Sequence, residues 1–376
     1  TCALPILGHE TANGVPLVLE TTSDTELMNN PRASVQQVYG RIMEDLDEAI
    51  TLLTGASARA DKAEISVEVA YGLRARANLL MGKWAAAASD AAKAYGTSAP
   101  YSVADVSQPT FYNATDNAWI WGIVVTTEDY LAKTGIVNWP SNLCSLTGMG
   151  YTTAASATDV AYRLINKNLW AKIPETDVRK GWWVDEDLHS PVLDNGLGED
   201  YAYYWANGMF NGGTFPSKFS PYTNVKFGPD NGTFADTDNA QDWPLMRVEE
   251  MKLIEAEALG RDNLATGKQK LEEFVRQYRD PSYTCTASSL DAFIDEVWFQ
   301  RRVELWGEGF ALFDILRLKK PIIRQGANYP INSTFAEIAA EAPIMIYRIP
   351  EAETSVNSAI TEADNNPAAM APTPVN

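Results

Sequence analysis

The sequence has few of the side chains that most often carry out catalysis or bind metals. Its 376 residues include only three cysteines and two histidines, His9 and His189. The cysteines, Cys2, Cys144 and Cys285, are far apart and form no Cys-x-x-Cys pair, which excludes a disulfide framework and the common zinc motifs. A Ser-His-Asp or Cys-His arrangement would need one of the two histidines, and each is more simply an ordinary surface or loop side chain.

Basic side chains are also scarce. The chain has 30 Lys and Arg residues against 49 Asp and Glu residues, so that its formal net charge at pH 7 is −19. A protein that binds nucleic acid or an anionic lipid surface needs a positive field. The charge balance and the lack of a Lys/Arg cluster therefore argue against nucleic acid and a polybasic membrane contact as partners.

Long apolar runs are missing as well. The longest uninterrupted run, Ala118–Val125, is far shorter than the roughly 20 residues that a membrane-spanning helix needs. Residues 1–5 show neither a starting Met nor the basic and apolar regions of a signal peptide, so we expect a mature, processed or truncated form. Hydrophobic residues make up 45% of the chain, including 11 Trp, which predicts a globular protein with a sizeable core.

Residues 31–96 have the period of amphipathic helices. Apolar residues recur at three- and four-residue steps between Val35 and Leu53. A second stripe runs through Ser66–Met81, and an alanine-rich segment follows at Ala85–Tyr95. Small side chains on both segments let two antiparallel helices approach closely, which predicts a tetratricopeptide-like helical hairpin. The repeat signature is incomplete, and a generic helical hairpin is the alternative.

Residues 100–244 have a different composition, rich in Gly, Asn, Thr, Ser and aromatic residues. Short strand-like runs such as 118–125 alternate with turn signals at Asn195-Gly196, Asn207-Gly208, Asn211-Gly212-Gly213 and Asn231-Gly232. One helix is expected from about Thr158 to Trp170. Long irregular loops in a compact protein are usually functional, so we expect this region to bind the ligand. The alternative is that the loops only decorate the scaffold.

Helical periodicity returns over residues 245–320. Apolar faces predict one helix that starts at Leu245, a second over 271–278, and a densely apolar third segment over 293–316 that two glycines interrupt. Residues 342–376 form an extended, proline-containing tail, and we expect the part beyond Asn365 to be loosely held.

These patterns together predict a single domain over residues 1–376. Its expected fold is mainly α, with a tetratricopeptide-like helical-hairpin scaffold and a long loop-rich region that contains short strands.

Sequence motifs over residues 243–317 carry a family resemblance. Residues 243–251 read WPLMRVEEM, and Glu255-Ala256-Glu257-Ala258 follow them. Residues 271–279 contain Val-Arg, and residues 297–317 contain Arg-Arg-x-Glu-Leu, Glu-Gly and Asp-Ile-Leu-Arg. These patterns are similar to the motifs of the SusD/RagB family of surface nutrient-binding lipoproteins.

Both ends of the chain extend the resemblance. Residues 14–18 read GVPLV, and residues 31–46 and 347–367 resemble further family segments. Two departures stand within the C-terminal motifs: Gln300 replaces the usual glutamate, and Ala311 or Leu312 stands where a basic residue is common. These departures put one structural ion pair in doubt and leave the family assignment unchanged.

The resemblance implies a function and a location. We expect a non-enzymatic receptor that captures an oligosaccharide or another nutrient and passes it to a SusC-like TonB-dependent transporter. It would lie on the extracellular face of the outer membrane. In the family the VPLV stretch lies well inside the protein, so we expect an N-terminal segment with the lipid anchor to be missing here. No cofactor is implied.

Three alternatives to a glycan receptor stay open. Some relatives in the family bind peptides, and an aromatic-rich pocket suits either ligand. The many acids could also provide the carboxylate pair of a glycan-active hydrolase, separated by about 5–9 Å. Finally, a helical-repeat scaffold could bind only protein and make no use of the aromatic loops.

The loop region supplies candidate ligand contacts. A saccharide site needs flat aromatic rings for the apolar faces of sugars, flanked by polar groups for the hydroxyls. Aromatic residues stand among glycines and acids in this region. Together with the polar Asn207 they make up the predicted ligand-binding set Trp182, Trp183, Tyr201, Tyr203, Tyr204, Trp205, Asn207 and Trp243. Packing of these rings onto the helical scaffold is the competing interpretation.

Two charged clusters have simpler interpretations than catalysis or metal binding. Arg301, Arg302, Glu304, Glu308 and Asp314 have helical spacing in an apolar segment, which favours a structural ion-pair network. The acidic run 236–242 offers oxygen ligands for Ca²⁺ but lacks the glycine and distal glutamate of an EF-hand, so a solvated acidic loop is expected and no metal is assigned.

Overall fold

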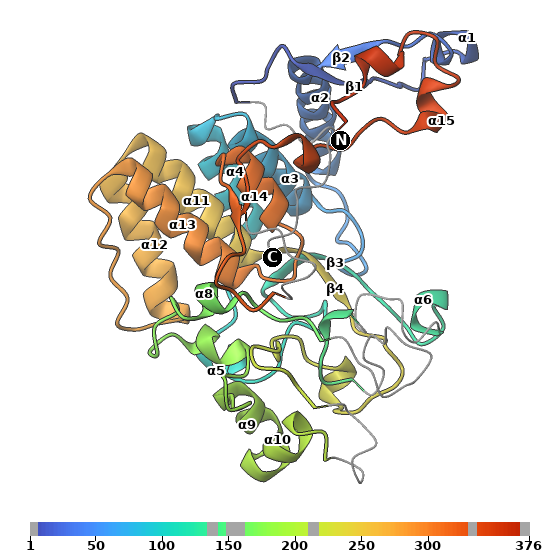
Figure 1. The fold of residues 1–376 in the computed structure, drawn as a ribbon. Coiled ribbons are helices and arrows are strands. Elements are labelled where there is room, and N and C mark those ends of the chain that lie inside the picture. The colour runs from blue at the N-terminus through green and yellow to red at the C-terminus, as the bar shows by residue number, and fades with distance from the viewer. Residues whose placement is uncertain (1–6, 134–141, 148–161, 210–217, 330–336, 369–376) are drawn as a thin grey trace.

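The structure is a computed structural model that describes residues 7–133, 142–147, 162–209, 218–329 and 337–368 (Figure 1). Most of its regular structure is helical, and the strands are short. The prediction of a mainly α fold is therefore confirmed. No helix in these ranges combines the length and the apolar composition that a membrane span requires.

The scaffold begins with three helices that the periodicity predicts. They are α2 (Val35–Leu53), α3 (Val67–Leu80) and α4 (Trp84–Tyr95). Helix α2 begins at Ser34, whose hydroxyl accepts the backbone N–H of Gln37 in a capping box. Helices α3 and α4 pack closely along their alanine-rich faces, as expected for a tetratricopeptide-like hairpin.

Helix α11 (Val248–Asp262) is the centre of the scaffold (Figure 1). It packs against α4 on one side and against α12 (Leu264–Tyr278) and α13 (Leu290–Glu304) on the other. It is buried along almost its whole length, including the acidic residues Glu249, Glu250 and Glu257. A short helix, α14 (Ala311–Arg317), follows the glycine interruption after α13.

Among the described residues, three pairs of antiparallel strands accompany the helices. β1 (Asn13–Pro16) pairs with β2 (Arg32–Ser34), β3 (Trp119–Ile123) pairs with β4 (Trp243–Arg247), and β5 (Ile322–Ile323) pairs with β6 (Glu337–Ile338). The expectation that a helix starts at Leu245 is wrong, because Leu245 lies in β4 and α11 begins at Val248. Pairing with β3 holds this segment extended, which local periodicity does not reveal.

The loop-rich region differs from its prediction in three places. Of the helix expected over 158–170, only α8 (Lys167–Trp170) is helical within the described residues, and residues before Tyr162 lie outside them. Asn195-Gly196, predicted as a turn, lies within α9 (Pro191–Leu197). Tyr201–Trp205 belong to a helix, α10 (Glu199–Ala206), because Ala202, Trp205 and Ala206 form an apolar face that packs into the core. The Asn211-Gly212-Gly213 signal lies outside the described residues.

The two ends of the described chain pack against each other (Figure 1). The side-chain NH₂ of Asn357 donates to the carbonyl of Asn30 at 2.7 Å, and the guanidinium of Arg32 donates to the carbonyl of Asp364 at 2.6 Å and to Oδ1 of Asn366 at 2.9 Å. The expectation that the tail is loosely held beyond Asn365 is therefore wrong for Asn366. These contacts form between residues more than 300 positions apart.

Close packing of α11 on α12 depends on glycine. A Cβ placed on Gly267 would lie 2.3 Å from Cα of Gly260, which is backbone and cannot move aside. We expect Gly267→Ala to lower the free energy of unfolding by about 1–3 kcal/mol through overpacking. Gly40 on α2 has no atom within 4 Å of such a Cβ, so Gly40→Ala should raise the stability by about 0.5–1 kcal/mol.

Urea unfolding followed by circular dichroism measures both changes. A Gly267→Ala variant as stable as the wild type would contradict this account of the α11–α12 contact.

Candidate ligand-binding site

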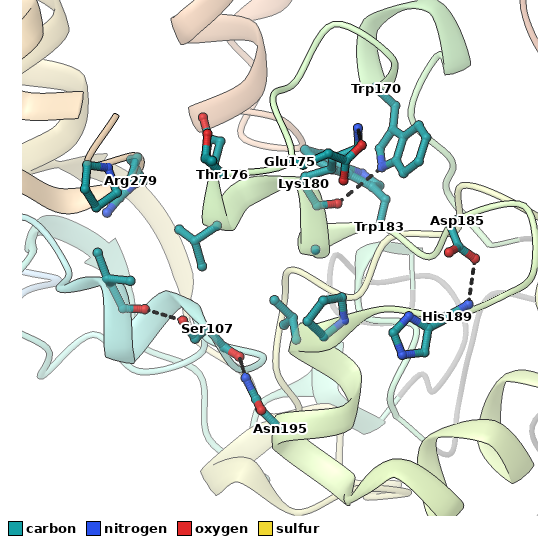
Figure 2. Close-up of a pocket in the computed structure, with 17 residues that line it drawn as sticks. Ser107, Trp170, Glu175, Thr176, Lys180, Trp183, Asp185, His189, Asn195 and Arg279 are labelled. Atoms are coloured by element: carbon teal, nitrogen blue, oxygen red, sulfur yellow. Dashed lines mark hydrogen bonds and ion pairs between the residues drawn. The ribbon is translucent and has the colours of Figure 1, made fainter. Parts of the chain in front are cut away.

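A cavity of about 490 Å³ lies in the loop-rich region. It is enclosed by α8, by the 3₁₀ helix η1 (Val178–Trp182), by α9 and by the short helix α5 (Val103–Val106). Figure 2 shows Trp170, Lys180, Asp185, His189 and Asn195 around it.

Helix caps, and the close contact of η1 with α9 at Gly181, position the walls of this cavity. Asp177 caps η1 by accepting the backbone N–H of Arg179, and Ser190 caps α9 by accepting that of Leu193. The Ser190 hydroxyl also donates to the carbonyl of Gly181, which ties α9 to η1. A Cβ on Gly181 would lie 2.9 Å from Cγ2 of Val192, so glycine lets the two elements meet.

Trp170 forms an aromatic wall of the cavity (Figure 2). Its ring is half-buried, its Nε1–H donates to the carbonyl of Lys180 at 3.2 Å, and its edge meets Tyr222 with ring centroids 5.3 Å apart. Nζ of Lys180 lies 4.5 Å from the centroid of the Trp170 ring and forms an ion pair with Glu175. An indole held in this way resembles the rigid aromatic surface that sugar binding needs.

The turn from Asp185 to His189 forms a polar rim. Oδ1 of Asp185 accepts the backbone N–H groups of Asp187 and His189, each at 2.9 Å. Nε2 of His189 lies 2.6 Å from Oδ2 of Asp194 on α9. Partial burial raises the pKa of the Asp194 carboxyl, and the contact with His189 opposes this shift.

The base of the cavity meets a fully buried group of charges around Glu304. Arg279, which lines the cavity, donates from Nε to Oε2 of Glu304 at 2.7 Å and from NH2 to Oε1 of Glu249 at 3.0 Å. Arg247 contacts Glu249 at 2.8 Å and Glu308 at 2.8 Å. These side chains come from β4, α11, the end of α12 and α13, so the group joins the scaffold to the loops.

Two further cations complete this group. Arg179 pairs with Asp177 at 2.6 Å and lies 3.4 Å from Glu304. Nζ of Lys226 donates to the carboxylate of Glu308 at 2.7 Å and to two backbone carbonyls. Four cations and four carboxylates balance within this buried charge network, which comprises Asp177, Arg179, Lys226, Arg247, Glu249, Arg279, Glu304 and Glu308.

Arginines within the buried charge network keep the carboxylate of Glu304 ionised. Burial alone would raise the pKa of the Glu304 carboxyl, but Arg279, Arg247 and Arg179 outweigh it and hold the pKa far below its usual range. Burial lowers the pKa of Lys226 to about 8, against the attraction of Glu308. Glu304 and Glu308 thus lie in a structural network, as the sequence pattern predicts. Arg301 and Asp314 form a neighbouring ion pair at 2.7 Å, whereas Arg302 packs over the ring of Trp298.

Gln300 lies beside this network and explains one departure from the family pattern. Its side-chain carbonyl accepts a hydrogen bond from NH2 of Arg179 at 2.5 Å, and its NH₂ donates to Glu296 at 2.9 Å. A neutral acceptor here satisfies Arg179 without adding a fifth negative charge to the balanced group.

Three of the predicted ligand contacts lie in the core. Trp182, Trp183 and Trp205 are at most 1% exposed. Nε1–H of Trp182 donates to the carbonyl of Val106 at 3.0 Å, and Nε1–H of Trp205 donates to that of Ser145 at 3.4 Å. Their burial is the arrangement expected from the competing packing interpretation. Trp183 nevertheless lines the cavity, and its Nε1–H has no acceptor among the described residues.

The predicted tyrosines are exposed. Tyr201, Tyr203 and Tyr204 are 59%, 58% and 49% exposed on α10, at the end of the molecule beyond α9 (Figure 1). Asn207 ends this helix and donates from its side chain to the carbonyl of Tyr203 at 2.9 Å. Trp243 lies apart from them, half-buried in β4 opposite Ile123.

The predicted ligand-binding set does not include Trp170, Lys180, His189 or Asn195, which line the cavity. The sequence places Trp170 at the end of an expected helix and Asn195 in an expected turn, and only the fold brings these four residues together. Across the described ranges, no group of three or more His, Cys, Asp or Glu residues is arranged to hold a metal ion. The calcium interpretation of the acidic run 236–242 therefore gains no support.

Comparison with known proteins assigns the family. Residues 152–367, more than half of the chain, match the sequence model of the SusD family, and the chain therefore belongs to this family. The same fold occurs in a SusD-like carbohydrate-binding protein of Bacteroides vulgatus, with a TM-score of 0.72 and 21% identity over 96% of this chain and 73% of the other.

Two further solved structures are similar to this chain. A SusD superfamily protein of Bacteroides thetaiotaomicron has a TM-score of 0.71 and 20% identity over 97% of this chain and 73% of its own. A laminarin-binding SusD-like protein has a TM-score of 0.50 and 20% identity over 83% and 67% of the two chains. Among curated proteins, none matches this chain.

The buried charge network generates a stability prediction. We expect Glu304→Gln to lower the free energy of unfolding by about 3–5 kcal/mol, because three buried arginines lose a shared carboxylate. The matched control on the same helix is Asp295→Asn, whose side chain is 56% exposed and pairs with Lys320, and its effect should stay below about 1 kcal/mol. Chemical unfolding of both variants at pH 7 gives the comparison, and equal effects would contradict a special role for Glu304.

Proposed function

We propose that this protein is a non-catalytic receptor that binds an oligosaccharide or polysaccharide at the cavity beside Trp170. The observation that carries this proposal is the cavity itself: a space of about 490 Å³ that has an aromatic wall and a polar rim, in a chain of the SusD family. The similar proteins described as carbohydrate-binding and laminarin-binding support the choice of ligand class.

The chemistry of the cavity suits a sugar. A pyranose presents apolar C–H faces that pack on an indole, and its hydroxyls both donate and accept hydrogen bonds. Around Trp170 the cavity offers both hydrogen-bond donors and hydrogen-bond acceptors. They belong to Lys180, Asp185, His189 and Asn195, among others. Polar groups of mixed type around one aromatic ring favour a glycan over a purely apolar ligand.

The exposed tyrosines of α10 would extend this site along a polymer. α10 directly follows α9, which lines the cavity, and its three tyrosines present rings and hydroxyls to solvent. Exposed aromatic side chains clustered on one surface commonly mark an interaction site. In this proposal the receptor acts on the outer-membrane surface and passes its glycan to a SusC-like TonB-dependent transporter.

Replacing Trp170 tests the site. We expect Trp170→Ala to weaken glycan binding about tenfold or more, a change of about 1.4 kcal/mol, because the aromatic wall is removed. The control is Trp298→Ala on α13, also half-buried but outside the cavity, which should leave affinity within about twofold. Titration calorimetry against a panel of polysaccharides that includes laminarin measures both.

The same panel separates the proposed function from its alternatives. Binding without release of reducing ends supports a receptor. Release of reducing ends would instead identify a hydrolase, and binding of peptides alone would identify a peptide receptor. Equal glycan affinity of the wild type and Trp170→Ala would exclude the cavity as the site.

The tyrosine surface makes a prediction that depends on ligand length. We expect the triple variant Tyr201→Ser/Tyr203→Ser/Tyr204→Ser to bind the polysaccharide at least fivefold more weakly than the wild type. Its affinity for a di- or trisaccharide should change less than about twofold, because only a long ligand reaches α10. Affinity electrophoresis and calorimetry measure the two ligand lengths. Equal losses for short and long ligands would contradict a separate contact on α10.

A further inference from the structure

Three consecutive acids lie in a turn, and one of the three contributes to the wall of the cavity. Asp185, Glu186 and Asp187 are consecutive in the turn that leads to His189, and Asp185 itself lines the cavity (Figure 2). Glu186 and Asp187 are exposed. We refer to residues 185–187 as the acidic rim. Asp185 thus brings one carboxylate to the cavity, and two further acids follow it directly in the chain.

The fold holds the acidic rim in place. The carboxylate of Asp185 accepts two backbone N–H groups of its own turn, and Glu186 accepts the hydroxyl of Tyr222 at 2.7 Å. Leu188, at φ 66°, turns the chain and buries its side chain between the exposed residues on either side. Hydrogen bonds within the turn and from Tyr222 therefore hold the carboxylates of Asp185 and Glu186.

The basic side chains that line the cavity already contact other carboxylates. Lys180 forms its ion pair with Glu175, His189 contacts Asp194, and Arg279 belongs to the buried charge network. No ion pair of the described residues includes a member of the acidic rim. The negative charge of the acidic rim is therefore not neutralised locally, and it acts on its surroundings. Burial, the hydrogen bond to Glu186 and the negative charges of Glu186 and Asp185 together raise the pKa of Tyr222 to about 12.

We propose that the acidic rim is a charge filter, which lets uncharged glycans bind in the cavity and repels glycans that carry carboxylate or sulfate groups. This inference rests on the proposed function and deepens it by naming the class of glycan. Like charges a few ångströms apart repel each other by about 1 kcal/mol or more, depending on the local dielectric, and salt weakens the repulsion. The carboxylate of Asp185 in the cavity wall, with two more acids in the same turn, would therefore disfavour an anionic ligand relative to a neutral one of equal shape.

The test uses ligands that differ only in charge. Laminarin, hydroxyethyl-laminarin and carboxymethyl-laminarin share one backbone, and the two derivatives have substituents of similar size. We expect the wild type to bind the hydroxyethyl derivative at least tenfold more tightly than the carboxymethyl derivative at low ionic strength. The difference should shrink in 0.5 M NaCl, because salt screens exposed charges.

A variant without the charges of the acidic rim should bind carboxymethyl-laminarin more tightly than the wild type does. Asp185→Asn/Glu186→Gln/Asp187→Asn keeps the hydrogen-bond acceptors and removes the charges, so the carboxymethyl derivative should bind within about threefold of the hydroxyethyl derivative. A misfolded protein could not show such a gain. The control Glu20→Gln/Glu44→Gln/Glu48→Gln changes net charge equally at exposed positions outside the cavity and should keep the tenfold difference.

The outcomes separate the two proposals. Equal binding of the two derivatives by the wild type, or an unchanged difference in the acidic-rim variant, would overturn the charge filter and leave the receptor proposal intact. A control variant that also loses the difference would assign discrimination to the overall charge of −19 and overturn the filter too. Failure of laminarin and of every other neutral glycan in the panel to bind would overturn the proposed function, and the filter with it.

Discussion

The structure depends on the pairing of buried charges around Glu304. Removing eight ionised groups from water is costly, and only mutual contact within the buried charge network offsets this cost. The contacts join residues from β4, α11, α13 and the loop-rich region, which lie far apart in the sequence. Any shift of the loops against the scaffold would leave a buried charge without its partner. The network thus stabilises one arrangement of loops and helices.

The candidate site uses the rigidity that this network provides. Arg279 and Asp177 belong both to the network and to the lining of the cavity, so the base of the cavity is held by the scaffold. The upper walls come from short capped helices and from the turn of the acidic rim. A cavity that is built in advance loses little conformational entropy when a ligand binds, which favours binding.

The helices of the scaffold were predictable, and the candidate site was largely not. Apolar residues at helical spacing identify α2, α3 and α4 because each buries one face. β4 and α10 escape prediction, since strand pairing with β3 and packing into the core decide their conformation. Aromatic residues clustered in the sequence drew attention to Trp182 and Trp205, which pack in the core. Trp170 lines the cavity but has no aromatic residue next to it in the sequence.

The sequence by itself determined the family, the mainly α fold and the acidic character of this protein, because motifs, periodicity and net charge are local or additive properties. Only the tertiary structure decided which aromatic rings face solvent. It also decided which acids pair with a buried cation and which acids near the cavity have no cationic partner among the described residues. Burial and pairing depend on contacts between distant residues, as Arg179 with Glu304 and Glu186 with Tyr222 illustrate. The chemistry of the site therefore follows from the fold rather than from any one segment.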